Sequence, residues 1–310
     1  MVSGAGGSDR GVTLHGWLIL DKPLELGSTQ GVSAAKRALR TGGYGKAKVG
    51  HGGTLDPLAT GVLPIAIGEA TKLAGRMLDS DKVYDFTIRF GEQTDTLDAE
   101  GPVFATSDVR PTAAALAAIL PRFTGPIAQV PPAYSALKVD GQRAYELARA
   151  GEEVVLATRD VTIHALTLAT APGDGPLEQA TLTAHVSKGT YIRSLARDIA
   201  LALGTVGHVT YLRRTKAGPF SLDRAITLDK LDEIAKARSL EHSLLPLSAG
   251  LDDIPALALT PDQAGALRQG RVLAGIAADD GQAFAMLGEL PVALVEVEQG
   301  SVRVVRGFNL

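Results

Sequence analysis

A single carboxylate, Asp56, lies in the stretch GHGGTLDPLATG (residues 50–61), among glycine, hydroxyl and aliphatic residues. An isolated ionised carboxylate can act as a nucleophile or as a general base. The glycines around it allow a large planar ligand to approach the backbone closely. Because Asp56 precedes Pro57, its carboxylate could instead cap backbone N–H groups of its own turn. The stretch alone leaves both interpretations open.

An ionised carboxylate with apolar flanks needs a cationic partner to stay charged. Arg193 is the best candidate, in the first turn of the helix that follows SKGTYIR, although an exposed helix arginine is the commoner role. For Tyr84 and Tyr191, which border apolar faces, a core position is the default expectation. The simplest interpretation of His51 is a loop histidine, and that of Lys22 a solvated lysine at a strand end. None of these residues is decisive alone.

The composition excludes several kinds of chemistry. The 310 residues contain no cysteine, which excludes disulfides, thiolate catalysis and cysteine-based zinc sites and fits a reducing cytoplasm. The six histidines show no H-x-x-x-H spacing, so we expect no metal site. GGYGKAK lacks the first glycine and the Ser or Thr of a phosphate loop, and the sequence has no G-x-S-x-G elbow.

Charge is distributed unevenly along the chain. Residues 31–55 hold five basic residues and no acid, and residues 188–216 hold six basic residues against one acid, Asp198. Residues 79–108 instead hold eight acids against two basic residues. The two basic segments could meet in space as a phosphate-binding surface or form two separate solvated faces, and charge alone favours neither.

Hydrophobic periodicity predicts the elements that must position these residues. Residues 82–91 alternate as a half-buried strand with Tyr84 on its apolar face. Residues 121–153 carry four prolines and predict a functional loop or lid with a short helix at 144–150. Further strands are predicted at 16–23, 180–187, 208–218, 283–287, 292–298 and 301–308, and helices at 33–39, 112–119, 190–204 and 228–240.

The chain divides by composition into three parts. Residues 1–13 predict a disordered tail, without the apolar stretch of a signal sequence. Residues 14–248 hold the candidate site and predict one large domain. After a linker over 245–255, residues 251–310 become acidic overall and predict a small β-rich domain. No apolar stretch is long enough to span a bilayer.

Several stretches together resemble the bacterial family of tRNA pseudouridine synthases that modifies uridine 55 in the T-loop, the TruB family. The similarity runs from Trp17 to Thr227 in family order and spacing, and the G-H-x-G-x-L-D-P block is highly specific. This sequence has GHGGTLDP where other members have GHTGALDP or GHSGTLDP, a variation that leaves the acid unchanged. The stretches are LILDKP (18–23), GHGGTLDPLATGVLPIAIGEATK (50–72), SDKVYDFTIRFGEQTDTLDAEG (80–101), PPAYSALKVDGQRAYELARAG (131–151), SKGTYIRSLARDIALALG (187–204) and YLRR (211–214).

The resemblance implies an α+β pseudouridine synthase fold, with a mixed, largely antiparallel sheet flanked by helices and loops. It implies that Asp56 is the catalytic aspartate and that Arg193 pairs with it. Tyr84 matches the tyrosine that stacks on the target base. Tyr191 and Leu212 match positions that line the uridine pocket.

Other matches concern the RNA. His51 matches the histidine that helps to displace the target nucleotide from the T-loop, and Lys22 and Pro23 match a motif packed beside the site. Residues 121–153 resemble the mobile insertion that closes on the RNA. Residues 251–310 broadly resemble the PUA-like RNA-binding domain of the family.

The implied reaction is the conversion of uridine 55 to pseudouridine, an isomerisation that needs no cofactor or metal. Asp56 would act at C1′ or on the C2′ proton, and the sequence leaves this choice open. The implied partner is the T-loop and T-stem of tRNA, bound in the cytoplasm by a monomer without a protein partner or membrane. Alternatives are a non-catalytic RNA-binding protein or tRNA chaperone, and a guide-RNA-dependent relative acting on ribosomal RNA. The short N-terminus, the PLATG sequence and the long insertion favour the stand-alone enzyme.

Overall fold

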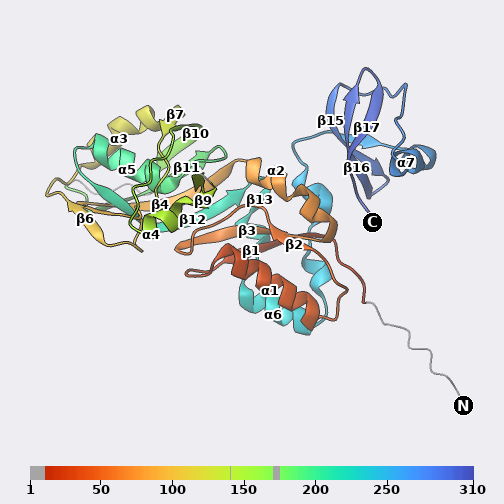
Figure 1. Cartoon of the computed structure of the whole chain (residues 1–310), viewed down its shortest axis with the longest axis horizontal. Helices are drawn as coiled ribbons and strands as arrows, with labels where there is room; N and C mark the ends of the chain where they lie inside the picture. The colour runs from red at the N-terminus through yellow and green to blue at the C-terminus, as the bar shows by residue number, and fades with distance from the viewer. Residues whose placement is uncertain (1–10, 140, 170–174) are drawn as a thin grey trace, which may run out of the picture.

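The computed structural model of the chain describes residues 11–139, 141–169 and 175–310 (Figure 1). Within these residues a large sheet fills one side of the molecule, and a smaller sheet, blue in Figure 1, lies apart from it. Most of the tail predicted over residues 1–13 lies outside the described residues. No helix of the described part is both long and apolar enough to cross a lipid bilayer.

Among the described residues, nine strands form the large sheet, in the order β1-β3-β12-β4-β11-β10-β7, with β2 beside β3 and β13 beside β12. β3 and β12 run parallel, and the other described pairs are antiparallel, which confirms the predicted mixed sheet. The strands are β1 Gly16–Lys22, β2 Val49–His51, β3 Ala59–Ile67, β4 Lys82–Phe90, β7 Gly125–Gln129, β10 Arg159–Leu168, β11 Gln179–Val186, β12 Gly207–Ala217 and β13 Phe220–Ser221.

The burial of β4 follows its sequence pattern. Phe86, Ile88 and Phe90 are fully buried on one face, while Arg89 is exposed on the other, as the alternation predicts. β3 was not predicted, because ATGVLPIAI has one polar residue, Thr60, and no alternation to mark a second face. A strand buried on both faces shows an apolar run instead of alternation.

Helices cover the two halves of the sheet. α1 and α6 pack on the β1–β3 half and form one core, while α5 packs on the β4–β11 half and forms another. Tyr84 and Leu212 contact both cores, so the two halves meet where β4 pairs with β12. The helices are α1 Ser28–Thr41, α2 Ala74–Asp79, α3 Ala113–Ile119, α4 Ala144–Arg149, α5 Ile192–Ala202, α6 Leu228–Lys236 and α7 Pro261–Arg268.

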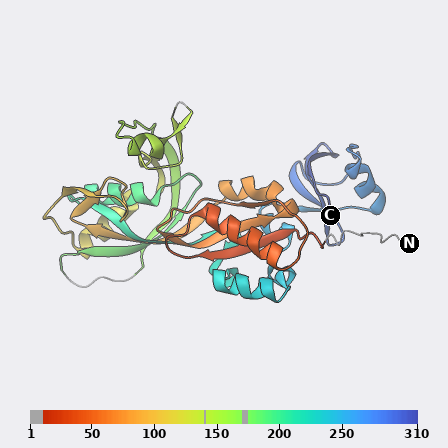
Figure 2. The ribbon, with the colours of Figure 1, turned by 60° about the horizontal axis from the view of Figure 1, so that its bottom comes forward.

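The segment predicted as a loop, residues 121–153, is partly regular. β7 pairs with β10 at the edge of the large sheet, so this part of the segment is a sheet strand. The part around α4, residues 142–149, projects away from the sheet as the yellow-green segment of Figure 2. The short elements here and elsewhere are β5 Glu92–Thr94, β6 Val103–Thr106, β8 Lys138–Val139, β9 Gln142–Arg143, η1 Gly68–Leu73, η2 Leu120–Phe123, η3 Leu222–Arg224, η4 Leu240–Ser243 and η5 Leu247–Gly250.

The smaller sheet begins close to the boundary predicted at residue 251. Phe284 and Phe308 meet edge-on, 6.0 Å between ring centroids, and join a core that also contains Trp17 and Met77 of the large unit. Polar contacts add to this packing, because Lys72 Nζ donates to the Gly307 carbonyl at 2.8 Å. The strands, in sheet order, are β14 Ala256–Ala258, β15 Gly281–Leu287, β16 Leu290–Glu298 and β17 Ser301–Gly307.

Candidate active site

Asp56 lies in the loop between β2 and β3, and a buried arginine binds backbone carbonyls of this loop and of β3. Arg214, on β12, donates from Nε to the Val62 carbonyl at 2.8 Å and from its Nη atoms to the Thr54 and Gly53 carbonyls at 3.3 and 3.1 Å. Gly53 has a φ of 141°, a conformation that side chains other than glycine's rarely adopt. The loop is therefore fixed by a cation that reaches it from a strand far along the chain.

Lys22 holds the other side of the loop. It is 0% exposed, and its Nζ donates to the carbonyls of Pro23, Leu26 and Pro57 at 3.1, 2.6 and 3.2 Å. Burial lowers the pKa of Lys22 to about 8, although the nearby Asp56 opposes this shift. The interpretation of Lys22 as a solvated strand-end lysine is wrong, because three carbonyls from two turns converge on its amine.

The carboxylate of Asp56 pairs with Arg193. Oδ2 of Asp56 lies 3.0 Å from Nη2 of Arg193, whose side chain is 7% exposed while that of Asp56 is 41% exposed. The guanidinium is thus buried, and the carboxylate faces open space. Of the two interpretations of Asp56, the contact with a distant arginine is the one the structure shows, and the exposed position considered for Arg193 is wrong.

Arg193 also binds a second carboxylate and two carbonyls. Asp98 Oδ2 lies 3.3 Å from Nη1 of Arg193, and the carbonyls of Thr96 and Tyr134 accept hydrogen bonds at 2.9 and 3.0 Å. Asp98 is itself buried and accepts a hydrogen bond of 2.6 Å from the Thr96 hydroxyl. One guanidinium therefore contacts two carboxylates in a fixed geometry.

A cavity of about 620 Å³ lies on one side of this ion pair. Its wall includes the predicted residues Tyr84, Tyr191 and Leu212 together with Asp56 and Arg193. Burial raises the pKa of Tyr191, so its phenol stays protonated at neutral pH. A cavity of this size, with aromatic and apolar side chains beside charged and polar ones, suits a small planar ligand that carries polar groups.

A second cavity of about 860 Å³ opens on the other side of Asp56 and Arg193, and His51 lies on its wall. Burial lowers the pKa of His51, with the Arg214 charge as a smaller cause. Its Nδ1 is buried and has no hydrogen-bond partner among the described residues. His51 therefore lies beside the ion pair but not on the wall of the cavity that Tyr84 and Tyr191 line.

The comparisons with known proteins show the family of the chain. A model of the TruB family pseudouridylate synthase N-terminal domain matches residues 39–192, and one of the tRNA pseudouridylate synthase B C-terminal domain matches residues 193–252. A protein from Novosphingobium aromaticivorans named tRNA pseudouridine synthase B is 68% identical over 298 residues, 96% of this chain and 98% of the relative. The chain belongs to the TruB family. The enzyme class implied by the resemblance, a tRNA pseudouridine synthase, is confirmed.

Other TruB-named relatives and solved structures extend this picture. The protein of that name from Zymomonas mobilis is 61% identical over 296 residues, 96% of each chain. An H/ACA ribonucleoprotein bound to a substrate RNA containing 2′-deoxyuridine has a TM-score of 0.71 at 22% identity, covering 99% of this chain and 92% of that chain. An archaeal box H/ACA Nop10–Cbf5 complex has a TM-score of 0.67 at 23% identity, covering 94% and 86%. These structures share the fold, which confirms the predicted fold class.

Two residues of this TruB site were missed in the sequence. Asp98 was noted only among the eight acids of residues 79–108 and in the quoted stretch 80–101, and Arg214 only among the basic residues of 188–216 and in YLRR. Burial of a charged side chain is the property that singles them out, at 5% and 1% exposure. A single sequence gives little sign of that burial, because the contacts that cause it come from other elements.

The basic segment at 188–216 differs from both expectations for it. Arg193 and Arg214 are buried, and three other cations pair with acids of the same chain. The pairs are Arg197 with Asp198 at 2.8 Å, Arg213 with Asp21 at 2.9 Å and Lys188 with Asp79 at 3.0 Å. Most of this segment therefore supports the loop and the sheet instead of a phosphate surface.

Proposed function

We propose that this TruB-family enzyme isomerises uridine 55 in the T-loop of tRNA to pseudouridine, with Asp56 as the catalytic carboxylate. The observation that carries the proposal is the contact of Asp56 with buried Arg193 at the edge of a cavity lined by Tyr84, Tyr191 and Leu212. A carboxylate fixed beside a cation, and open to a cavity of this size, has the access that a nucleophile or base needs.

The reaction needs one such carboxylate. Asp56 either attacks C1′ of the ribose or removes the C2′ proton, and the N1–C1′ bond breaks. The released ring turns in the cavity, and C5 forms a bond to C1′ as the Asp56–C1′ bond breaks or, on the other route, as the proton returns to C2′. Loss of the proton on C5 and gain of one on N1 complete the isomerisation without an oxidant or reductant. Arg193 keeps Asp56 charged by direct pairing, and Asp98 holds Arg193 in place.

The target base must leave the folded T-loop before it reaches Asp56. Flipping a base costs a few kcal/mol, and stacking on an aromatic ring returns about 1–3 kcal/mol. Tyr84 supplies that ring in our proposal, while Tyr191 and Leu212 enclose the base. His51, in the adjoining cavity, would occupy the position that the flipped nucleotide vacates.

We assign the rest of the chain to holding tRNA. Residues 14–248 form the catalytic domain, residues 121–153 form an insertion that closes on the RNA, and residues 251–310 form a PUA-like RNA-binding domain. The projection of α4 away from the large sheet supports the second assignment (Figure 2). The cysteine-free composition fits a cytoplasmic enzyme, and we propose that it acts as a monomer.

Substitution of the carboxylate tests the proposal. Asp56→Asn keeps the shape of the side chain and removes the charge, so we expect no pseudouridine at position 55 and a tRNA affinity within a few-fold of wild type. Chemical labelling with primer extension measures product, and filter binding measures affinity. Asp85→Asn is the matched control, because Asp85 bonds to Thr183 at 2.7 Å on the other face of β4. Measurable turnover by Asp56→Asn would refute the role of Asp56.

The reaction also separates the alternatives. Incubation of purified protein with unmodified tRNA, without any other component, should yield pseudouridine at position 55. A tRNA chaperone would bind and refold the tRNA without product. A guide-RNA-dependent relative would need an added RNA and partner proteins. Light scattering of the same preparation tests whether the protein is a monomer.

A further inference from the structure

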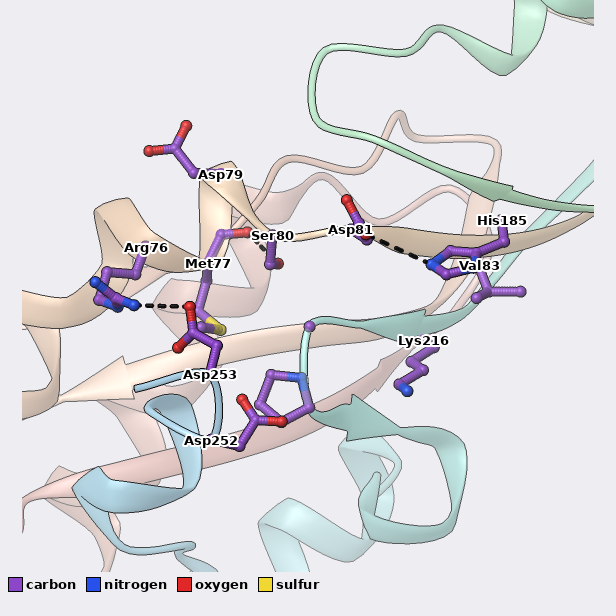
Figure 3. A pocket seen from close by; sticks show the side chains of 12 residues that line it. Arg76, Met77, Asp79, Ser80, Asp81, Val83, His185, Lys216, Asp252 and Asp253 are labelled. Atoms are coloured by element: carbon purple, nitrogen blue, oxygen red, sulfur yellow. Dashed lines mark hydrogen bonds and ion pairs between the residues drawn. The ribbon is translucent and has the colours of Figure 1, made fainter. Parts of the chain in front are cut away.

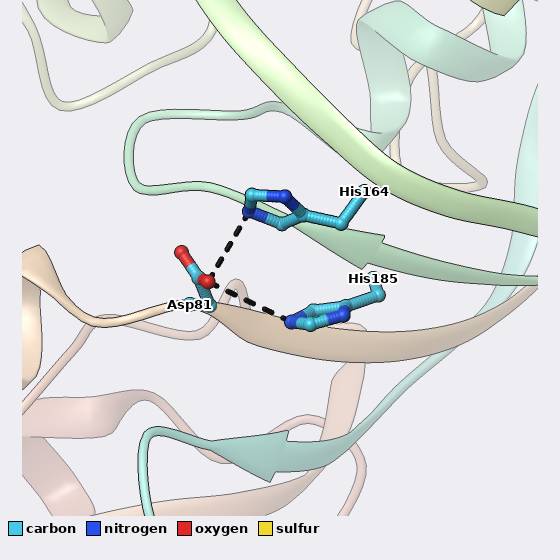
Figure 4. Close-up of side chains that lie close together, drawn as sticks. All are labelled: Asp81, His164 and His185. Carbon is cyan, nitrogen blue, oxygen red and sulfur yellow. Dashed lines mark ion pairs between the residues drawn. The ribbon is translucent and has the colours of Figure 1, made fainter. Parts of the chain in front are cut away.

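Three side chains converge on the face of the large sheet opposite to Tyr84. Nε2 of His164 lies 3.2 Å from Oδ2 of Asp81, and Nε2 of His185 lies 3.7 Å from the same oxygen. The two imidazole rings are 4.8 Å apart between centroids, tilted by 49°. Figure 4 shows both rings directed toward the Asp81 carboxylate. The proposed reaction uses none of these residues.

Strand pairing places the two histidines on the same face. Ile163 on β10 faces Val186 on β11, and Ala165 faces His185, so β10 has one extra residue at His164. His164 and Ala165 are both exposed, which interrupts the alternation of β10. Such β-bulges are frequent next to functional sites. The small Ala165 is directly opposite His185, and His164 lies beside it.

Asp81 reaches the histidines from a third segment, just before β4. Val83 pairs with His185, and Asp81 is two residues earlier, on the same face of the sheet. The backbone of Asp81 is held independently, because its carbonyl accepts the Gly218 N–H at 2.9 Å. The backbone position of Asp81 is therefore fixed, whether or not the imidazoles contact its carboxylate.

Two imidazole nitrogens and one carboxylate oxygen form a donor set for first-row transition metals. Two ligands bonded to one ion at about 2.0–2.2 Å lie about 3–4 Å apart. The two histidine–carboxylate distances, 3.2 and 3.7 Å, already satisfy this spacing. Ligand atoms of all three residues lie within 4.8 Å of one another, so a small side-chain rotation would bring them onto one ion.

We propose that Asp81, His164 and His185 bind a divalent first-row transition-metal ion such as Zn²⁺, with water at the remaining positions. The three side chains are 48%, 37% and 44% exposed, so an ion reaches them from solvent. The bound ion links β10 and β11 to the start of β4, the strand that carries Tyr84. The spacing of the histidines in the sequence gave no sign of this cluster, because the strand pairing creates it.

A neighbouring cavity of about 530 Å³ adds a favourable field (Figure 3). Asp81 and His185 lie on its wall, which they share with cationic Arg76 and Lys216 and with further carboxylates. Two of its four carboxylates are paired, Asp79 with Lys188 at 3.0 Å and Asp253 with Arg76 at 2.7 Å. Asp81 and Asp252 have no lysine or arginine partner among the described residues, and they lower the cost of bringing a divalent cation to the edge of the cavity.

Titration of the full chain, free of any histidine tag, with ZnCl₂ tests the proposal. We expect one equivalent to bind in the micromolar range at pH 7.5, and to raise the thermal unfolding temperature. His164→Ala, His185→Ala and Asp81→Asn should each weaken binding about tenfold or more, because even residues that only support a ligand have effects of this size. Co²⁺ in place of Zn²⁺ should give visible absorption bands that these variants lose.

His242→Ala is the matched control. His242 is an exposed histidine whose Nε2 lies 3.8 Å from Oε1 of Glu241, outside the proposed cluster. This variant should bind Zn²⁺ as wild type does. Because the three cluster residues are exposed, their variants should unfold at the wild-type temperature without metal. Absence of stoichiometric binding by wild type would overturn the proposal, and so would binding by His164→Ala and His185→Ala equal to that of wild type. Either result would leave two histidines that only neighbour a carboxylate.

Discussion

The carboxylate of Asp56 is the most exposed member of a group of charges that is otherwise buried. Arg193 holds it directly, while Arg214 and Lys22 bind the carbonyls of its loop. The apolar flanks of Asp56 indicated a cationic partner with Arg193 as the best candidate, and the resemblance to the TruB family implied their contact. The burial of Lys22 was not predicted, because its acceptors are carbonyls, which every residue carries and no residue type reveals.

The buried amine of Lys22 gives the stability of the fold a specific pH dependence. Burial lowers the pKa of Lys22 from 10.5 to about 8. Below pH 8 both the folded and the unfolded chain hold this proton, and between about pH 8 and pH 10.5 only the unfolded chain does. The free energy of unfolding therefore rises with pH in this window. We expect urea unfolding to show wild type gaining stability relative to Lys22→Met between pH 8 and pH 10.

Two comparisons isolate this effect. The similarly buried Lys82, whose pKa burial also lowers to about 8, is present in both proteins and cancels in the difference. The exposed Lys36 serves as the control, since Lys36→Met should give a difference from wild type that is flat over the same range. A wild-type advantage over Lys22→Met that stays constant or falls with rising pH would contradict the assignment.

At the level of elements, patterns with two distinct faces were predicted and patterns without them were missed. α5 and β4 have clear apolar faces, and both occur within two residues of their predicted ends. β10 was missed because the bulge at His164 breaks its alternation. The first turn of α1 was missed because Ser28 and the residues after it carry no apolar stripe.

The start of α5 depends on a side chain from another element. Gln129, at the end of β7, is buried and accepts the Tyr191 N–H at 2.8 Å. Gln129→Leu leaves that N–H without an acceptor, so we expect the free energy of unfolding to fall by about 1–3 kcal/mol. Because Tyr191 and Arg193 begin this helix, turnover should fall as well. Urea unfolding and kcat/KM measure the two effects.

Gln129→Glu is the matched variant for this contact. Glutamate keeps the acceptor, and its charge is favourable beside a helix N-terminus. It also removes the glutamine Nε2, which has no partner among the described residues. Gln129→Glu should therefore lose less stability than Gln129→Leu, and an equal loss would show that packing, not the hydrogen bond, matters here.

For the molecule as a whole, the sequence predicted β15, β16 and β17 of the smaller sheet but neither β14 nor where the sheet packs. The acidic composition after residue 250 marks a separate unit, and the four-stranded sheet begins there, at Ala256. Its contact with η1 and α2 depends on single aromatic and polar residues from both units, among them Phe308 and Glu69. Contacts between surfaces so distant in sequence leave no periodic pattern.

This packing gives a prediction about the whole chain. Phe308→Ala removes a buried ring between the units and should cost about 3–5 kcal/mol of stability. If residues 251–310 bind RNA as proposed, the loosened sheet should raise KM for tRNA and leave kcat near wild type. Val305→Ala, at an exposed position on β17, should change neither property. Calorimetry and steady-state kinetics measure them, and a fall in kcat alone would contradict the proposal.

The position of β12 in the large sheet has a consequence during protein synthesis. Residues 207–217 insert between β3 and β4 and join the two halves of the sheet, although β3 and β4 are neighbours in the sequence. Until residues 207–217 have left the ribosome, Ala59 on β3 and Phe86 on β4 lack the strand that pairs with both. Pairings between distant segments form late because they close long loops. A nascent chain truncated before residue 207 should therefore be inert, since its catalytic centre is assembled only when the late strand arrives.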